Sequence, residues 1–356
     1  PDIVHCHDWQ AAPLLAFLKT RAGAHSPWAG VRTFFTIHNL AYQGRYGREQ
    51  LAFTGLDPSL FHPGCLEYYG DINFMKLGIC MADKLTTVSP RYAREIQTLD
   101  YGEGLDGMLR SRSADLTGIL NGIDYSVWSP AQDSHIAQKF SVDDLSGKKA
   151  CKADLQRTMN LPEADVPVFS VVSRLFWQKG IDLIVDALER LMEFDLQLIV
   201  LGTGEPSLEN HLLGAAQRYP QKLGLALKFD VGLSHKIQAG SDFFLMPSRY
   251  EPCGLTQMYS LAYGSVPIVR RTGGLADSVR DINKVNLRRG TANGISFVPR
   301  TSAAVVRSVQ RAMELYFEPD LLERLRKRGM QEDFSWDRSS RAYAALYRQG
   351  LGQPDA

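Results

Sequence analysis

Two positively charged residues stand where an apolar segment of the chain gives way to a helical pattern. Arg174 and Lys179 follow the predicted strand 168–173 and precede an amphipathic helix predicted over 180–192. Arginine binds phosphate oxygens through paired hydrogen bonds, and lysine adds a compact charge. The pair could therefore hold a diphosphate and stabilise the negative charge that develops on it as a leaving group. Taken alone, two such cations are also compatible with an exposed, solvated loop.

Two further loops have the composition of anion-binding turns. Residues 248–257 follow the predicted strand 243–246, residues 271–277 follow the predicted strand 266–269, and both loops contain glycine and precede a helix. Backbone N–H groups and the positive end of a helix would meet there, which suits a phosphate. Glu251 could bind sugar hydroxyls at the mouth of the first loop, with a structural cap as the alternative. A phosphate and a sugar bound together indicate a nucleotide sugar, and hence a glycosyltransferase.

Weaker signals lie at the ends of other predicted strands. Gly202 and Gly204 form a G-x-G turn that suits the close approach of a nucleotide. A plain turn is equally compatible, because the third glycine of a dinucleotide fingerprint is missing. Asp8 and His38 end two strands in the first part of the chain and could bind sugar hydroxyls across a cleft between domains. A lone histidine, however, is more often a structural residue.

The sequence contains no D-x-D motif, which commonly holds a divalent ion on the diphosphate in metal-dependent glycosyltransferases. With Arg174 and Lys179 available instead, we expect the leaving group to be stabilised without a metal, and we expect no cofactor. The P-loop pattern, the G-x-S-x-G hydrolase motif and the H-E-x-x-H zinc motif are missing as well. These patterns therefore give no support to a P-loop nucleotidase, a serine hydrolase or a zinc protease.

Length and composition fit a globular protein of two domains. The chain has 356 residues, of which 44% are hydrophobic, and a net charge of +1. This charge balance favours neither nucleic acid nor a membrane surface as the main partner. Five cysteines without a C-x-x-C pair fit a reducing compartment better than a disulfide framework or a zinc site. No apolar run approaches the roughly 20 residues of a membrane helix.

Strand and helix patterns alternate along the chain, which predicts parallel sheets covered by helices. The predicted strands lie at 3–5, 32–37, 84–88, 115–120, 168–173, 196–201, 225–229, 243–246 and 266–269. A polar stretch from Trp128 to about Val166 indicates a connection between domains with an accessory helix over 148–159. Ligands of such sheets bind at the carboxyl ends of the strands. Six candidate residues occupy such ends: His38, Asn121, Arg174, Gly202, Glu251 and Gly273.

A series of short motifs occurs in a fixed order between Pro1 and about Tyr347. They are HDWQ at 7–10, FTIHNLAYQG at 35–44, TVSP at 87–90, LNGID at 120–124 with WSP at 128–130, VSRL at 172–175 with QKG at 178–180, EPCGLTQ at 251–257, RTGGL at 271–275 and DFSW at 333–336. Together these motifs resemble those of glycogen (starch) synthases of the bacterial and plastid type.

The resemblance implies an α/β protein with the GT-B glycosyltransferase fold, in which two Rossmann-like domains with parallel sheets face a cleft. Residues 1–130 would form the C-terminal part of the N-terminal, acceptor-side domain, which would be incomplete. Residues 131–166 would form a linker and accessory helix, and residues 167–335 the C-terminal domain that binds the nucleotide sugar. Residues 336–356 would form a helix that packs back towards the first domain.

The resemblance also implies the reaction and its partners. Glucose would pass from ADP-glucose to the non-reducing end of an α-1,4-glucan, glycogen or starch, with retention at the anomeric carbon. No nucleic acid, membrane or metal would take part. The protein would be cytoplasmic in a bacterium, or plastid-located in a plant.

Site residues follow from the same resemblance, position by position. Arg174 and Lys179 would hold the diphosphate, Glu251 the transferred glucose, and His38 the glucose 6-hydroxyl. Asp8 would lie near the anomeric carbon and the acceptor. Phe229 stands where related sequences can carry a tyrosine that stacks on adenine. The full set of implied substrate-binding residues is Asn39, Asn121, Gly202, Gly204, Phe229, Cys253, Gly254, Leu255, Thr272, Gly273, Gly274 and Leu275.

Two departures from the family pattern bear on activity. The chain opens on Pro1, in a segment that already has strand character, and lacks the family's N-terminal Lys-x-Gly-Gly-Leu loop. We therefore expect it to be N-terminally truncated, with weak or no synthase activity, whereas the full-length protein should be active. Tyr259 replaces the second glutamate of the E-x7-E pattern found in many other GT-B enzymes, which favours the synthase family. Two alternatives are a GT-B enzyme with another nucleotide sugar and a non-catalytic fragment that binds nucleotide or glucan.

Overall fold

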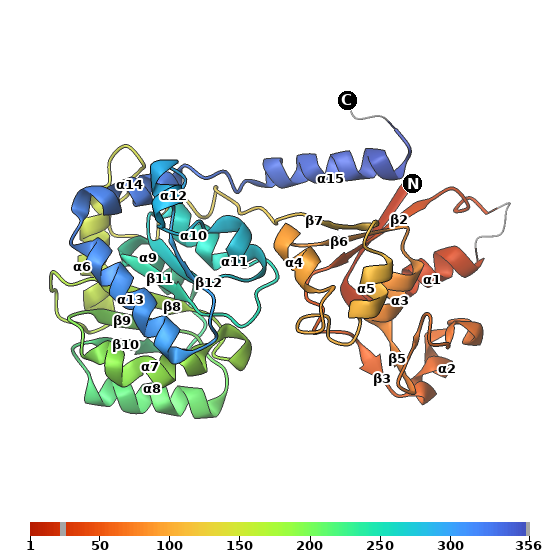
Figure 1. Ribbon diagram of the computed structural model, residues 1–356, viewed down its shortest axis with the longest axis horizontal. Helices are drawn as coiled ribbons and strands as arrows, with labels where there is room; N and C mark the ends of the chain where they lie inside the picture. Colours follow the sequence, from red (N-terminus) through yellow and green to blue (C-terminus); the bar gives the residue numbers. More distant parts are fainter. Residues whose placement is uncertain (22–25, 354–356) are drawn as a thin grey trace. The chain divides into compact units, whose positions relative to one another are not determined.

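The computed structural model describes residues 1–21 and 26–353, and its chain divides into two compact units (Figure 1). Unit 1 comprises residues 1–121 and the segment from Asp337 onward, and unit 2 comprises Gly122–Trp336. Residues 122–130, which the sequence analysis places in the first domain, thus belong to unit 2. Backbone contacts explain this, because the Ile123 N–H donates to the Phe334 carbonyl at 2.7 Å.

Unit 1 is built on a parallel sheet of four strands in the order β1-β2-β6-β7. Its strands are β1 (Ile3–His7), β2 (Arg32–Ile37), β6 (Lys84–Thr87) and β7 (Leu116–Gly118). Three short strands that the sequence analysis does not predict form a separate antiparallel sheet: β3 (Arg45–Tyr46), β4 (Glu67–Tyr68) and β5 (Asp71–Asn73). The helices of this unit are α1 (Asp8–Arg21), α2 (Leu51–Thr54), α3 (Phe74–Met81), α4 (Pro90–Glu95), α5 (Asp106–Ser111) and α15 (Trp336–Gly350).

The C-terminal helix α15 packs on the sheet of unit 1 through a small apolar cluster. Leu346 of α15 is buried with Phe34 of β2 and with Ile119, just after β7. The Tyr347 hydroxyl also lies 2.7 Å from Nδ1 of His5 in β1. The helix therefore belongs to this unit although it lies more than 200 residues further along the chain.

Unit 2 contains a parallel sheet of six strands in the order β10-β9-β8-β11-β12-β13. The strands are β8 (Val168–Val172), β9 (Gln197–Leu201), β10 (Leu223–Ala226), β11 (Phe243–Met246), β12 (Val266–Arg270) and β13 (Ile295–Phe297). The helices are α6 (Gly147–Thr158), α7 (Ile181–Met192), α8 (Pro206–Arg218), α9 (Val231–Gly240), α10 (Thr256–Ala262), α11 (Gly273–Ser278), α12 (Lys284–Arg288), α13 (Ser302–Tyr316) and α14 (Pro319–Met330). Counted along the chain, this is the doubly wound order 3-2-1-4-5-6, with its switch point between β8 and β11.

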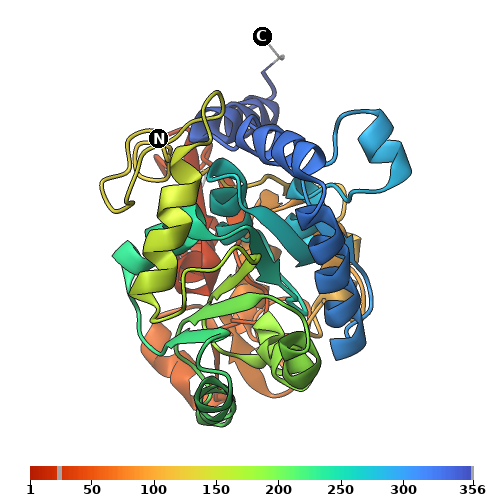
Figure 2. The same ribbon diagram turned by 90° about the vertical axis from the view of Figure 1, so that its left-hand side faces the viewer.

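Alternate residues of each strand in unit 2 supply two separate apolar layers. In β9, Leu198 and Val200 pack with α7, α8 and α13, whereas Ile199 and Leu201 pack on the other face with α6 and α9. Figure 2 shows α6 and α13 on opposite sides of this sheet. Successive side chains of a strand point to opposite faces, so a sheet that is covered twice needs continuous apolar strands. The run Gln197–Leu201 has that character, which is why these strands are easy to recognise in the sequence.

The bounds of the edge strand β10 differ from the prediction. The sequence analysis expects a strand over 225–229, whereas β10 runs from Leu223 to Ala226 and pairs with Leu198–Leu201 of β9. Phe229 consequently lies in the loop after β10, with 91% of its surface exposed. The apolar character of Leu225, Leu227 and Phe229 mimics a strand, but only the first of them pairs in the sheet.

Candidate active site

A cavity of about 340 Å³ opens at the switch point of the unit 2 sheet. Its walls are the ends of β8 and β11 and the loops that follow these two strands. The lining residues include three from the predicted catalytic set, Arg174, Lys179 and Glu251, together with Gly254 and Leu255. Ligands of doubly wound sheets bind where the strand order reverses, so the fold itself places these side chains at the expected position.

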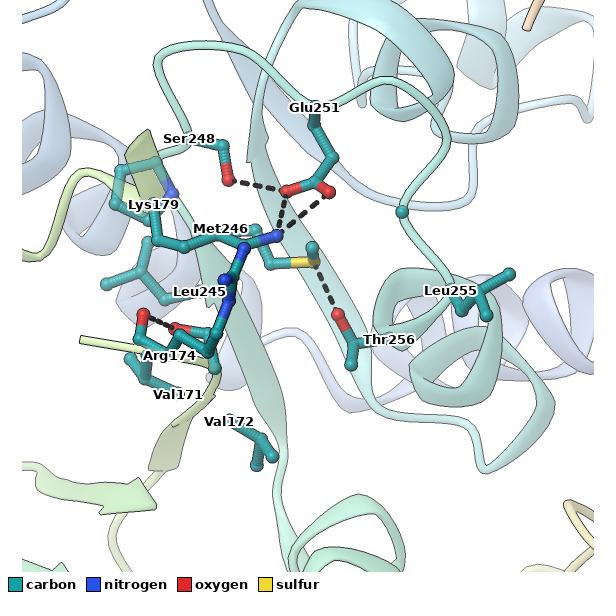
Figure 3. Close-up of a pocket in the computed structure, with 13 residues that line it drawn as sticks. Val171, Val172, Arg174, Lys179, Leu245, Met246, Ser248, Glu251, Leu255 and Thr256 are labelled. Carbon is teal, nitrogen blue, oxygen red and sulfur yellow. Dashed lines mark hydrogen bonds and ion pairs between the residues drawn. The ribbon is translucent and has the colours of Figure 1, made fainter. Parts of the chain in front are cut away.

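The charged groups converge inside this first cavity (Figure 3). Lys179 Nζ donates to both carboxylate oxygens of Glu251, at 2.9 and 2.7 Å, and the Ser248 hydroxyl donates to Glu251 Oε2 at 3.0 Å. The Arg174 side chain points toward the same two groups. Only 7% of the Glu251 side chain and 19% of the Lys179 side chain are exposed. Two cations and one carboxylate thus lie close together in a partly desolvated pocket, where charged groups interact more strongly than in water.

The loop that carries Arg174 is held by close backbone contacts to a neighbouring loop. A Cβ atom on Gly202 would lie 1.8 Å from the Ser173 carbonyl oxygen, and one on Gly204 would lie 2.1 Å from the Leu175 carbonyl oxygen. No side chain other than hydrogen fits at these two positions. The G-x-G turn predicted after β9 therefore positions the Arg174 loop, in addition to any contact that Gly202 makes with a ligand.

A second cavity of about 320 Å³ adjoins the first, and its lining includes three aromatic side chains. Phe229, Trp128 and Tyr259 line it, together with Gly202 and Thr203. The two cavities share four lining residues: Val172, Ser173, Arg174 and Thr256. One side can thus receive a planar apolar ring, the adjoining side can receive a doubly charged group, and Arg174 lies at their junction.

The predicted glycine-rich turn after β12 is buried behind the first cavity and lines neither cavity. Thr272, Gly273, Gly274 and Leu275 are almost fully buried. The Gly274 N–H donates to the carbonyls of Glu251 and Pro252, both at 3.1 Å. A Cβ atom on Gly274 would lie 1.9 Å from the Cys253 carbonyl oxygen. This turn thus supports the loop around Glu251, and the predicted contact of its N–H groups with the nucleotide stays a prediction.

Cys253 and Gly204, also predicted to bind substrate, do not line either cavity. Cys253 is buried, and its backbone lies between the Glu251 loop and the turn at Gly274. Gly204 forms an isolated parallel bridge with Leu175. Both residues therefore shape the loops that carry the charged side chains.

In unit 1, Asp8 and His38 lie together at the ends of β1 and β2. The His38 backbone N–H donates to Asp8 Oδ1 at 2.8 Å, and His38 Nε2 lies 2.9 Å from His7 Nδ1. Asp8 has a φ of 58°, a left-handed conformation that is uncommon for a residue other than glycine. Strained backbone of this kind clusters at functional sites, so it adds weight to the prediction for Asp8. Asn39 accepts a hydrogen bond from the Ala41 N–H at 3.1 Å, and Asn121 is half-buried at the end of the unit.

Two histidines beside His38 are kept neutral by their surroundings. Burial, with added repulsion from His7 and His38, lowers the pKa of His5 to about 4. Burial and the neighbouring His38 also lower the pKa of His7, although Asp8 opposes the shift. The rings of His5 and His7 stack with centroids 4.4 Å apart. At neutral pH these two side chains supply hydrogen bonds and not charge.

Neither a metal cluster nor a membrane helix is evident in the described part of the chain. Across residues 1–21 and 26–353, no group of three or more His, Cys, Asp or Glu side chains is placed to hold a metal ion. Within the same ranges, every helix is too short or too polar to cross a bilayer.

Comparisons with known proteins agree with this geometry. Residues 1–111 match the family described as "Starch synthase catalytic domain", and residues 154–332 match "Glycosyl transferases group 1". A glycogen synthase of Anaeromyxobacter sp. (strain Fw109-5) is 48% identical over 98% of this chain and 73% of its own length. A glycogen synthase of Myxococcus xanthus (strain DK1622) is 47% identical over 98% of this chain and 71% of its own length. The chain belongs to the bacterial glycogen synthase family.

Solved structures confirm the fold predicted for this glycogen synthase family member. The catalytic domain of starch synthase IV from Arabidopsis thaliana, bound to ADP and acarbose, superposes with a TM-score of 0.92 at 36% identity. The match covers 99% of this chain and 73% of that one. Sucrose-phosphate synthase from Thermosynechococcus elongatus, at 19% identity and a TM-score of 0.63, shares the fold alone. The predictions of a GT-B fold and of a glycogen or starch synthase are therefore confirmed.

Several residues that line the synthase cavities are not among those predicted from the sequence. Ser248 hydrogen-bonds to Glu251, Thr256 lines both cavities, and Trp128 and Tyr259 form part of the aromatic cavity. Ser248 and Thr256 stand inside a predicted anion-binding loop, so testing every polar residue of that loop would have found them. Trp128 stands in the WSP motif at 128–130, but the motif gave no sign of a binding role, because the contacts of Trp128 arise only when the segment before α6 packs on α9 and α10.

Proposed function

We propose that this glycogen synthase family member uses ADP-glucose as its donor and extends an α-1,4-glucan at the non-reducing end, with retention. One observation carries the proposal. Arg174 stands at the junction between a cavity that contains Lys179 and Glu251 and an aromatic cavity next to it. A nucleoside diphosphate has the matching order of parts, with a planar base at one end and a charged diphosphate at the other. The ADP in the solved starch synthase IV domain supports the choice of adenine nucleotide.

In this proposal the two cations hold the diphosphate and take up its developing charge. Lys179 now donates to Glu251 and would shift toward the phosphate oxygens as the donor binds. Glu251 would then be free to accept hydrogen bonds from hydroxyls of the transferred glucose. Preorganised cations in a partly desolvated site stabilise a leaving diphosphate without a reorganisation cost during the reaction. The proposal needs no metal, and neither a divalent ion nor another cofactor is part of it.

The residues of unit 1 are assigned to the sugar side of the reaction. His38 would contact the glucose 6-hydroxyl, Asp8 would lie near the anomeric carbon, and Asn39 and Asn121 would line the sugar site. The hydrogen bond from the His38 backbone N–H orients the Asp8 side chain, and the contact between His38 Nε2 and His7 Nδ1 orients the His38 ring. Imidazole and carboxylate groups suit hydroxyl recognition, because together they offer donors and acceptors of hydrogen bonds.

Retention is accounted for by attack on the face from which the diphosphate leaves. The acceptor hydroxyl forms the new bond to the anomeric carbon as the bond from that carbon to the diphosphate oxygen breaks. The proton of the acceptor hydroxyl passes to a phosphate oxygen of the departing ADP. Arg174 and Lys179 stabilise the anion that this step produces.

Donor choice and transfer can be measured separately. We expect ADP-glucose to raise the melting temperature of the chain more than UDP-glucose or GDP-glucose at equal concentration. Glucose incorporation into glycogen, followed with labelled ADP-glucose, tests transfer, and excess EDTA should leave its rate unchanged. Protection by UDP-glucose or GDP-glucose alone would contradict the donor assignment. Binding of ADP with no transfer by the full-length protein would support a nucleotide-binding module instead.

A further inference from the structure

An aromatic stack borders the second cavity and includes a residue from the segment before α6. The Trp128 ring lies parallel to the rings of His235 and Tyr259, each with a centroid distance of 3.9 Å and an interplanar angle of 9°. Two rings at equal distance cannot share one face of the indole, so Trp128 is sandwiched between them. His235 belongs to α9 and Tyr259 to α10. The stack therefore joins three separate parts of the chain.

A buried carboxylate fixes one end of this stack. Asp133 accepts hydrogen bonds from the Tyr263 hydroxyl at 2.5 Å, from His235 Nδ1 at 2.7 Å and from the His135 N–H at 2.8 Å. The side chains of His235 and Asp133 are only 2% and 1% exposed. Burial alone would raise the pKa of Asp133, but the hydrogen bonds from Tyr263, His135 and His235 together hold that pKa below its ordinary value. An ionised Asp133 can only accept, so His235 carries its proton on Nδ1 and its ring orientation is set.

The other end of the stack opens into the cavity. Trp128 and Tyr259 both line it, and the charged residues Lys228 and Asp230 belong to the same lining. Phe229, which is 91% exposed, lines the same cavity. Aromatic rings held at fixed angles around a space of about 320 Å³ suit a flat heteroaromatic group, which gains from stacking and needs few hydrogen bonds.

We propose that Trp128 is a specificity-determining residue for the nucleoside part of the donor and that Asp133, His235 and Tyr263 are positioning residues that hold it in place. This inference rests on the proposed function, because it assumes that the aromatic cavity receives the base and ribose. The proposal gives residues 122–146 a role in ligand binding, in addition to connecting the two units. A purely structural stack would stabilise the unit without any preference between parts of the ligand.

The test compares ligands that share only one part of ADP. Calorimetry on the wild-type chain and on Trp128→Ala would measure binding of ADP, AMP and inorganic pyrophosphate, all in excess EDTA. We expect Trp128→Ala to weaken ADP and AMP about 10-fold, in line with the loss of an edge-to-face aromatic contact and of the support that Trp128 gives to Tyr259, and to leave pyrophosphate within about twofold. Trp28→Ala, which removes an exposed tryptophan from unit 1, is the matched control and should bind all three ligands like the wild type.

The positioning residues need variants that keep the cavity intact. Tyr263→Phe removes only the hydroxyl that donates to Asp133, and Asp133→Asn keeps the shape of the side chain. In a preparation with measurable synthase activity, both should raise the KM for ADP-glucose several-fold while kcat stays within about twofold. Thermal melts of the same proteins show whether the unit remains folded. A fall in kcat with an unchanged KM would overturn the positioning role.

The outcomes separate this inference from the proposed function. If wild type binds ADP and Trp128→Ala binds AMP equally well, the role of Trp128 is refuted and the proposed donor stands. An equal loss of AMP and pyrophosphate binding would also refute it, because the effect would then not be specific to the nucleoside. A wild-type chain that binds neither ADP nor AMP would overturn both.

Discussion

The two units of this glycogen synthase family member present different chemistry at the ends of their strands. Unit 2 gathers Arg174, Lys179 and Glu251 in a partly buried pocket next to aromatic rings. Unit 1 gathers histidines with lowered pKa values beside His38 and a single carboxylate, Asp8. Under the proposed function, unit 2 would stabilise the charge of the leaving group and unit 1 would bind sugar hydroxyls. Each half of that statement can be challenged on its own.

The largest effect on activity is expected from removing the cations of unit 2. Arg174→Ala and Lys179→Ala should each lower kcat by about two orders of magnitude, roughly the effect of removing one preorganised charge-stabilising donor. Lys327→Ala is a suitable control, because Lys327 pairs with Glu323 on the exposed face of α14. Steady-state kinetics with ADP-glucose measure both. Near-normal turnover in both site variants would end the proposed role for the pair.

The second-largest effect is expected at the glycine turn that supports the loop around Glu251. Gly274→Ala places a methyl group 1.9 Å from the Cys253 carbonyl oxygen, so the loop around Glu251 must move. We expect the free energy of unfolding to fall by about 1–3 kcal/mol, as for overpacked cores, together with weaker ADP binding. Gly214→Ala in α8 is the matched control, since the nearest atom is 3.8 Å away, and it should stabilise the protein by about 0.5–1 kcal/mol. Normal ADP affinity in Gly274→Ala would show that the turn does not position the site.

A buried lysine gives unit 2 a pH dependence on the alkaline side. Lys148 Nζ donates to the carbonyls of Ala239 and Tyr263, at 2.8 and 3.1 Å, and burial lowers its pKa to about 7. Above that pH the folded state lacks a proton that the unfolded state keeps up to about 10.5, so this group makes stability rise with pH.

Lys148→Met removes this titration and both hydrogen bonds, at a cost of about 1 kcal/mol per bond. The gap in unfolding free energy between wild type and variant should widen from pH 7 to pH 9, as measured by urea denaturation. Lys149→Met, at an exposed neighbouring position, should show no such widening. A constant gap across that range would mean that Lys148 is not desolvated as described.

In unit 1, His5 should cause a smaller change of stability at acid pH. The pKa of His5 is about 4 when folded and 6.5 when unfolded, so its contribution to stability is complete above pH 6.5 and is lost as pH falls toward 4. His5→Gln should therefore flatten the decline of stability over that range, and His211→Gln on the exposed face of α8 should not. Because His5 is only partly buried, solvent screening keeps the effect modest. An unchanged acid profile in His5→Gln would contradict a neutral His5.

The sequence predicted strand bounds best where at least one face of the strand is buried. The runs Arg32–Ile37 and Phe243–Met246 form strands with the predicted bounds, because apolar continuity reflects burial directly. The predicted strand over 225–229 was placed too far along, since pairing with β9 and not hydrophobicity decides where β10 ends. The short strands of the second sheet in unit 1 have too few residues for any periodic signal.

The candidate site, too, could be predicted from the sequence only in part. Arg174, Lys179 and Glu251 follow predicted strands, and the sheet topology brings all three into one cavity. Gly273 and Gly274 follow a predicted strand too, and the structure shows them in close backbone contact with residues 251–253, a role that sequence alone does not distinguish from contact with a phosphate. Their part in substrate binding stays a prediction. Trp128 escaped prediction because its stacking partners lie more than 100 residues away, in α9 and α10.

The central claim is that Arg174 and Lys179 neutralise the departing diphosphate without a divalent ion. Calorimetric titration of ADP in excess EDTA, on wild type and on the Arg174→Ala/Lys179→Ala double variant, tests it most directly. The account predicts ADP binding by the wild type that added Mg²⁺ does not strengthen, and a loss of at least about 100-fold in affinity in the double variant. Binding that requires Mg²⁺, or that survives removal of both cations, would contradict it.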